Sequence, residues 1–200
     1  LYRKITNVAN GTISPDSYDA INGQQLYDRT NFAIATTNDT GDKGGIAYAS
    51  GIQSTAVGDN ANASGNYSTA LGTQSEASAN YTTALGYSAK ATEIGAMALG
   101  YSAQAEGEYS LALGYSANAS NFGAIAMGGY ANASGHGSTA IGGYANASGS
   151  YAMALGSNAS ASGYGSIALG GDAKSSEFGT IAIGGYSNAT AQNATAIGVG

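Results

Sequence analysis

The sequence has no cysteine, a single proline and only 6 basic and 12 acidic side chains among 200 residues. The absence of cysteine excludes a disulfide framework and a thiol nucleophile, and it fits any cellular compartment. The formal charge of -6 disfavours nucleic acid and anionic membrane surfaces as partners, because like charges repel. Hydrophobic runs fall far short of the roughly 20 residues that a membrane-spanning helix needs, so none is expected.

What the sequence has instead is a repeat of fourteen residues. An alanine, one bulky aliphatic residue and a glycine recur without any slip of register, from Ala56-Val57-Gly58 to Ala196-Ile197-Gly198. Such repetition is typical of a solenoid, in which each unit stacks on the previous one and shares its core with its neighbours. The strict register also argues against disorder, which 32 glycines and few large apolar residues would otherwise suggest.

Each repeat is predicted to form two short strands and two turns. We number positions from the alanine of each copy, so that Ala112 is position 1 and Ile125 is position 14. Positions 6 and 8 are nearly always alanine and position 7 is polar, which predicts a strand with one wet face. Positions 12 to 3 predict a second strand, with small residues at 13 and 1 and larger ones at 14 and 2. Glycine at position 3, and often at position 10, predicts the corners.

The larger side chains at positions 14 and 2 predict an oligomer interface. The alanines leave room only for a thin interior, so these side chains must point away from it. About twenty of them, at roughly 50 Å² each, would expose on the order of 1,000 Å², more than a soluble monomer tolerates. The period alone does not decide between two and three chains. The interface residues that we expect are Leu71, Leu85, Met97, Leu99, Leu111, Leu113, Ile125, Met127, Ile141, Leu155, Ile167, Leu169, Ile181 and Ile183.

Residues 1–41 break the period and carry two other motifs. Residues 5–11 read ITNVANG, and residues 19–27 read DAINGQQLY. A 4-3-4 spacing compatible with a short coiled coil follows at Leu26, Thr30, Ala33 and Thr37. The roll is expected to begin near residue 44, because residues 47–55 already match positions 6 to 14.

These residues resemble a known family. Repeats of Ser-Xaa-Ala-(Ile/Leu)-Gly followed by Ala-Xaa-Ala-Ser-Gly are similar to the head of trimeric autotransporter adhesins, the YadA-like surface proteins of Gram-negative bacteria. The segments 5–11 and 19–27 resemble that family's neck, where three chains converge into a coiled-coil stalk. The neck residues identified in this way are Val8, Asp19, Ile21, Asn22, Gly23, Gln25 and Leu26.

The resemblance implies an all-β fold, a left-handed parallel β-roll of 14-residue repeats assembled as a homotrimer, with positions 14 and 2 facing the threefold axis. It implies a neck or connector at 1–27, a short stalk or linker at 28–43 and a head β-roll at 44–200. The neck precedes the head here, whereas in a simple adhesin it follows the head. We therefore expect a fragment of a longer fibre with more than one head, anchored in the outer membrane only through a region beyond this sequence.

The function implied by the resemblance is adhesion at the bacterial surface. The implied partners are extracellular matrix proteins such as collagen and fibronectin, host cell surfaces, or other bacteria. Nothing in the sequence selects among them. The alternative is a structural spacer head in a long fibre that binds its ligands elsewhere.

The sequence has few residues of the types that catalysis or metal binding requires. The only histidine, His136, occupies position 11, where other repeats carry Phe122 or Ser150, which is typical of a turn or surface position. Glu106 and Glu108 alternate on a strand or turn, and no acidic or histidine cluster approaches a ligand spacing. We therefore expect no enzyme activity, no metal site and no cofactor.

Two other β-solenoid functions fit less well. A threonine ladder at position 14 could present hydroxyl groups to ice, but Met97, Leu111 and Ile125 interrupt it. A hexapeptide-repeat acyltransferase needs a six-residue period and a catalytic histidine, and fourteen is not a multiple of six.

Tyrosines recur at one corner of the repeat, at position 4 or 5. Because rungs stack at about 4.8 Å, their rings are expected to form a ladder along one edge. This ladder either stiffens the corner or serves as a contact stripe for an extended protein ligand. Its members are Tyr87, Tyr101, Tyr115, Tyr130 and Tyr144. The position-12 tyrosines are instead expected to pack beside the inner strand, and they are Tyr67, Tyr81, Tyr109 and Tyr151.

Overall fold

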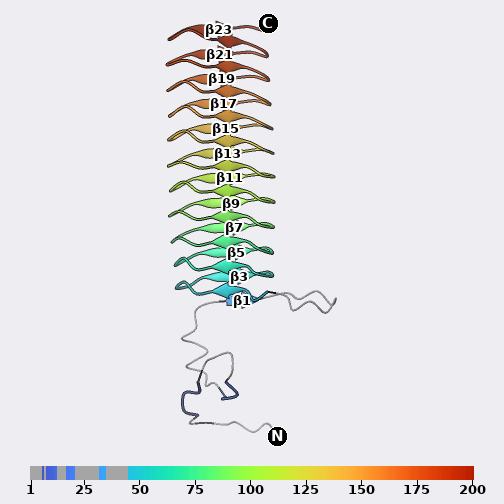
Figure 1. Cartoon of the computed structure of the whole chain (residues 1–200), viewed down its shortest axis with the longest axis vertical. Coiled ribbons are helices and arrows are strands. Elements are labelled where there is room, and N and C mark those ends of the chain that lie inside the picture. Colours follow the sequence, from blue (N-terminus) through green and yellow to red (C-terminus); the bar gives the residue numbers. More distant parts are fainter. Residues whose placement is uncertain (1–5, 7, 13–16, 21–31, 35–44) are drawn as a thin grey trace.

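The computed structural model describes residues 6, 8–12, 17–20, 32–34 and 45–200. The long C-terminal part is a parallel β-roll in which each repeat forms one rung of a stack (Figure 1). From residue 48 onward, each strand pairs in parallel with the strands one repeat away, as Ala112 does with Ala98 and Ala126. The predicted parallel β-roll with a fourteen-residue register is therefore confirmed.

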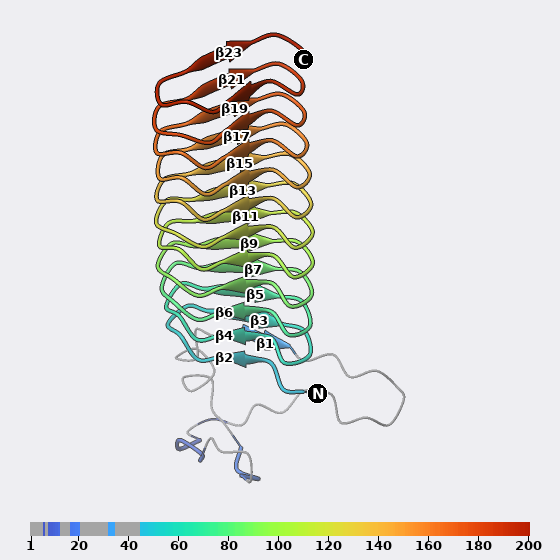
Figure 2. The ribbon, with the colours of Figure 1, turned by 45° about the horizontal axis from the view of Figure 1, so that its top comes forward.

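The described strands form two sheets that face each other across the roll (Figure 2). Sheet A contains β1 (Phe32–Ile34), β3 (Thr55–Val57), β5 (Thr69–Leu71), β7 (Thr83–Leu85), β9 (Met97–Leu99), β11 (Leu111–Leu113), β13 (Ile125–Met127), β15 (Thr139–Ile141), β17 (Met153–Leu155), β19 (Ile167–Leu169), β21 (Ile181–Ile183) and β23 (Thr195–Ile197). Sheet B contains β2 (Tyr48–Ala49), β4 (Asn62–Ala63), β6 (Glu76–Ala77), β8 (Lys90–Ala91), β10 (Gln104–Ala105), β12 (Asn118–Ala119), β14 (Asn132–Ala133), β16 (Asn146–Ala147), β18 (Ser160–Ala161), β20 (Lys174–Ser175) and β22 (Asn188–Ala189).

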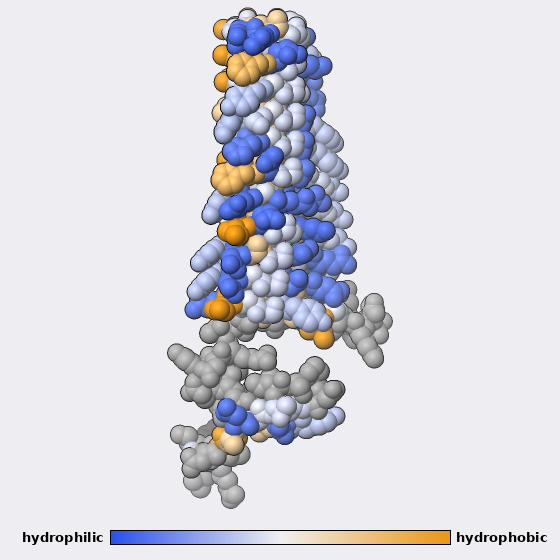
Figure 3. Space-filling view, turned by 60° about the vertical axis from the view of Figure 1, so that its left-hand side comes forward, coloured by the Kyte–Doolittle hydropathy of each residue, from blue (hydrophilic) through white to orange (hydrophobic). Residues whose placement is uncertain are grey.

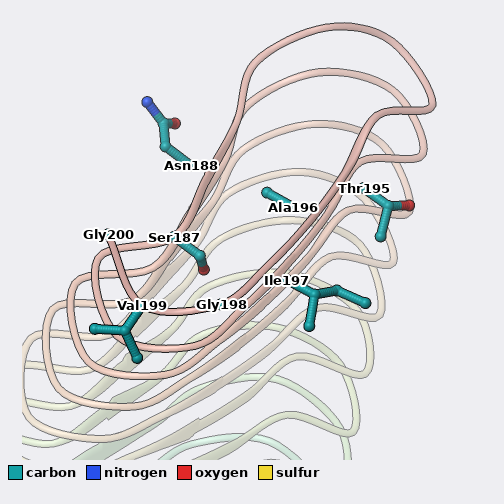
Figure 4. A pocket seen from close by; sticks show the side chains of 8 residues that line it. All are labelled: Ser187, Asn188, Thr195, Ala196, Ile197, Gly198, Val199 and Gly200. Atoms are coloured by element: carbon teal, nitrogen blue, oxygen red, sulfur yellow. The ribbon is translucent and has the colours of Figure 1, made fainter.

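The interior of the roll is made of alanine and small hydroxyl residues. Ala112, Ala117 and Ala119, at positions 1, 6 and 8 of one repeat, are 0% exposed. Figure 4 shows the same arrangement at the last rung, where Ala196 points between the sheets and Ile197 points away from them. Among the fully buried residues of the described chain, no side chain is larger than threonine, so the two sheets can pack closely together.

Buried hydroxyl groups in this interior are partly satisfied by the turns. The hydroxyl of Ser68, at position 13, donates to the carbonyl oxygen of Gly65 at 2.6 Å. The hydroxyl of Thr82 donates in the same way to the carbonyl of Ala79 at 2.6 Å. A hydroxyl that bonds its own turn avoids the desolvation cost of an unpaired polar group. Serine and threonine can therefore replace alanine at this position.

The turns depart from the prediction in one respect. Glycine at position 3 has the expected unusual backbone, with φ of 137° at Gly114, for example. The second turn, however, places its left-handed residue at position 12, with φ of 60° at Tyr81, and not at the position-10 glycine. Position-10 glycines serve close packing instead, since a Cβ on Gly65 would collide with the carbonyl oxygen of Ala79 in the next rung.

The strand boundaries and the N-terminal part also differ in detail from expectation. The inner strand spans positions 14 to 2, so it is shorter than the predicted 12 to 3. Strand β1, inside the segment expected as a stalk or linker, pairs with β3 through Phe32↔Thr55. This pairing adds one strand below the first full repeat.

Of the predicted neck residues, the structure describes Val8 and Asp19. The backbone N–H of Thr12 donates to a carboxylate oxygen of Asp19 at 2.9 Å. This hydrogen bond holds the pKa of the exposed Asp19 carboxyl below its usual value. The remaining neck residues lie outside the described part of the chain, and they are Ile21, Asn22, Gly23, Gln25 and Leu26.

Candidate binding surfaces

The outer face of sheet A carries the predicted interface residues. In the single chain these side chains are half-buried or exposed, with Leu113 39% and Leu85 41% exposed. Ala112, between Leu111 and Leu113 on the same strand, is fully buried. The larger side chains therefore point away from the roll interior, as predicted.

The tyrosines at positions 4 and 5 form a ladder along the first turn edge, which is the edge that follows each strand of sheet A. We call Tyr87, Tyr101, Tyr115, Tyr130 and Tyr144 the first aromatic stripe. The ring centroids of Tyr87 and Tyr101 are 5.1 Å apart, and those of Tyr101 and Tyr115 are 5.0 Å apart in a nearly parallel stack. This stacking confirms the predicted ladder.

The stripe stays continuous where tyrosine moves from position 4 to position 5. Tyr115 and Tyr130 meet at 5.2 Å with their rings inclined by 61°, and Tyr130 then stacks on Tyr144 at 4.9 Å. A side-chain hydrogen bond with Tyr115 raises the pKa of the exposed Tyr130 hydroxyl. All five rings are exposed at their outer edges, with Tyr144 62% exposed.

A second aromatic ladder lies on the opposite turn edge, and sequence reasoning missed it. Ten successive repeats each place one large side chain there, and we call this set the aromatic ridge. Its members are Ile52, Tyr67, Tyr81, Ile94, Tyr109, Phe122, His136, Tyr151, Tyr164 and Phe178. The expectation that the position-12 tyrosines are packing residues is wrong, because Tyr81 is 62% exposed. Their left-handed backbone places them in the turn, outside the inner strand.

The rings of the ridge contact one another along the roll. Phe122 stacks on His136 at 5.2 Å, and Tyr164 stacks on Phe178 at 5.4 Å. Edge-to-face contacts join these pairs through Tyr151, at 5.2 Å from His136 and 5.6 Å from Tyr164. His136 is therefore an exposed turn residue, as predicted, and it is also one member of an aromatic stack.

The outer face of sheet B is polar and partly ordered by an amide ladder. The side-chain amide of Asn118 donates to Asn132 at 3.0 Å, and that of Asn132 donates to Asn146 at 2.8 Å. Lys90 and Lys174 lie at the same position in other rungs and are exposed. This face is the wet side that the alternation at positions 6 to 8 predicts.

The described residues contain no group of three or more acidic, histidine or cysteine side chains able to hold a metal ion. A hollow of about 430 Å³ at the C-terminal end is lined by uncharged residues of the last two rungs, including Ser187, Thr195 and Ile197 (Figure 4). In this described part, no helix has the length and hydrophobicity needed to cross a membrane.

Comparison with known proteins gives two family matches that together span nearly the whole chain. The YadA head domain repeat (2 copies) matches residues 49–75, 63–89, 77–101, 91–117, 119–145, 147–173 and 175–200. The coiled stalk of trimeric autotransporter adhesin matches residues 4–46.

Individual proteins match less completely. Autotransporter adhesin EhaG of Escherichia coli O157:H7 is 74% identical over 27 residues, which is 14% of this chain and 2% of that protein. The crystal structure of the collagen-binding domain of the Yersinia adhesin YadA is 24% identical, with a TM-score of 0.48. That match covers 84% of this chain and 80% of the YadA domain. On the two family matches, the chain belongs to the YadA-like trimeric autotransporter adhesins, and most of its length consists of head repeats.

Proposed function

We propose that this chain is a homotrimeric head module of a bacterial surface fibre, with residues 1–27 as neck, 28–43 as a short stalk or linker and 44–200 as head. Membership of a trimeric family supports three chains. The half-exposed aliphatic ladder on sheet A supports that face as their interface, because burial of such a surface stabilises an assembly. The expected interface residues, from Leu71 to Ile183, then surround the threefold axis.

The proposed role is adhesion without catalysis, at the cell surface and through an outer-membrane anchor that belongs to the whole fibre. Family membership supports this role, including the absence of catalysis. The proposed partners are extracellular matrix proteins, host cell surfaces or other bacteria. A long rod with repeated exposed edges favours many weak contacts, which three chains multiply through avidity.

The first aromatic stripe is the proposed ligand contact. Its stacked and exposed tyrosines present rigid amphipathic rings of the kind that dominate protein interfaces. The observation that carries this assignment is the continuous ring contact from Tyr87 to Tyr144. The alternative role, a spacer that binds nothing, predicts the same fold but no binding.

A binding assay on immobilised collagen and fibronectin tests the proposal. We expect the trimer to bind at least one of them, and we expect the Tyr101→Ser/Tyr115→Ser variant to bind about tenfold more weakly. The matched control is Tyr67→Ser/Tyr81→Ser, which removes an equally stacked pair, 5.2 Å apart, from the other edge.

Each outcome of this assay has a defined meaning. Binding by the control variant at the wild-type level, together with loss in the Tyr101/Tyr115 variant, supports the stripe. If both variants bind as well as the wild type, the first aromatic stripe is not the ligand contact, and the polar residues at position 7 become the next candidate. Failure of the intact trimer to bind matrix proteins or itself favours the spacer role.

A further inference from the structure

The aromatic ridge has a regularity that the turn geometry does not require. In each of its turns one large side chain stands at position 11 or 12, and the other position holds glycine or a smaller polar residue, as in Phe122-Gly123 and Ser150-Tyr151. The next repeat after the ridge makes the same left-handed turn with Gln192-Asn193, whose φ is 56° at Asn193. The turn therefore folds without a large apolar group, and the ridge needs another explanation.

The backbone is also shaped to admit the rings. A Cβ on Gly95 would lie 2.6 Å from Cδ1 of Tyr109, and a Cβ on Gly137 would lie 3.1 Å from Cδ1 of Tyr151. Each of these tyrosine rings thus lies over the glycine of the preceding rung. Large side chains occupy ten rungs in succession, with Phe178, the last of them, still 51% exposed.

The charges of the roll are unevenly distributed around this ridge. Four of the carboxylates in the roll lie at positions 9 to 11, in the same turns as the large side chains of the ridge, and they are Glu93, Glu106, Glu108 and Glu177. The two lysines of the roll, Lys90 and Lys174, lie on the outer face of sheet B and not in these turns. Figure 3 looks onto this edge, where hydrophobic side chains recur in a column with hydrophilic ones beside them.

We propose that the aromatic ridge is a docking surface for an extended, cationic polypeptide segment. The aliphatic stems of lysine and arginine pack on ring edges while their charged heads reach nearby carboxylates, so this combination of rings and acid fits such side chains. The negative field without a compensating lysine on the same edge attracts a basic partner and repels an acidic one. This surface is distinct from the first aromatic stripe, and its test does not depend on matrix binding.

The length of the ridge sets the length of the partner segment. Nine steps of about 4.8 Å between ten rungs give about 43 Å, which an extended chain of about twelve to thirteen residues spans at roughly 3.3 Å per residue. Binding is therefore expected to strengthen with peptide length up to about that value. A compact basic group would engage only one or two rungs.

The experiment uses the intact chain and two labelled peptides of about twelve residues, one alternating arginine and serine and the other alternating glutamate and serine. Fluorescence anisotropy is expected to detect binding of the arginine peptide that weakens as salt rises. No binding of the glutamate peptide is expected. Failure of the arginine peptide to bind at low salt would overturn the proposal.

Two pairs of variants separate docking on the ridge from general attraction to an acidic protein. Each double variant removes two negative charges per chain. Glu106→Gln/Glu108→Gln removes them from a turn of the ridge, whereas Asp59→Asn/Glu76→Gln removes them from outside these turns. We expect Glu106→Gln/Glu108→Gln to weaken arginine-peptide binding about fivefold more than Asp59→Asn/Glu76→Gln does. Salt screens distant charges, so the carboxylates nearest the bound peptide contribute most to its binding. Equal weakening by the two pairs would overturn the proposal.

A third variant tests the rings at constant charge. Phe122→Gln/Tyr164→Gln introduces at position 11 the residue that Gln192 already provides in the same kind of turn. We expect arginine-peptide binding to fall about tenfold, with the sedimentation coefficient unchanged. Wild-type affinity in this variant would overturn the role of the rings. If this variant does not fold, the Glu106→Gln/Glu108→Gln variant still tests the role of the charges.

Discussion

Replacing Leu113 by aspartate is expected to break the assembly locally and to lower its melting temperature sharply. Leu113 lies on the outer face of β11, 39% exposed in the single chain. In the proposed trimer three aspartates would meet around one axis without cationic partners. An uncompensated buried charge costs about 3–5 kcal/mol. Thermal unfolding followed by circular dichroism measures the effect.

The matched control for Leu113→Asp is Gln104→Glu. It adds the same charge per chain to β10, on the outer face of sheet B, where Gln104 pairs in register with Lys90. We expect its melting curve to stay close to that of the wild type, because surface charges contribute little. An unchanged melting curve for Leu113→Asp would show that position 2 faces solvent in the assembly.

Replacing Gly114 by alanine is expected to destabilise the roll about as strongly. Gly114 has φ of 137°, a conformation that side-chain-bearing residues rarely adopt, and a Cβ there would lie 2.6 Å from the carbonyl oxygen of Gly128 in the next rung. The backbone strain and the clash each cost about 1–3 kcal/mol, so a loss of about 2–6 kcal/mol per chain is expected. Denaturant unfolding of the purified protein measures it.

A second glycine of the neighbouring rung supplies the control. Gly129 does not adopt a positive φ, and a Cβ there would meet no atom within 4 Å. Gly129→Ala is therefore expected to be neutral or to stabilise by up to about 1 kcal/mol, since alanine restricts the unfolded chain. Similar losses in both variants would contradict the packing of rungs described above.

The fold could be predicted from the sequence because each structural role in the repeat is filled by the same type of residue at the same position. Alanine at position 1 and larger residues at positions 14 and 2 alternate with the period of a strand, so the direction of Leu113 follows from counting. The fourteen-residue spacing gives the register of Ala112 and Ala126 directly. Handedness is a property of the connections and carries no residue signature, so the left-handed sense stays an implication of family resemblance.

The aromatic ridge could not be predicted in the same way, because its members do not keep one position. The large side chain moves between position 11, as in Phe122, and position 12, as in Tyr151. Position 11 and position 12 each vary in residue type from repeat to repeat. The left-handed backbone at position 12 shows that both positions lie in one turn and therefore on one edge of the roll. The sequence signal that could have identified the ridge is one large side chain at position 11 or 12 of each repeat, with glycine or a smaller polar residue at the other position.

The state of association tests the central proposal most directly, since the outer face of sheet A is assigned to a threefold interface. Sedimentation equilibrium of the purified chain at micromolar concentration is expected to give three times the 19.6 kDa of one chain. The Leu113→Asp variant is expected to shift toward smaller species under the same conditions. A stable, folded monomer of the wild-type chain at that concentration would contradict the proposal.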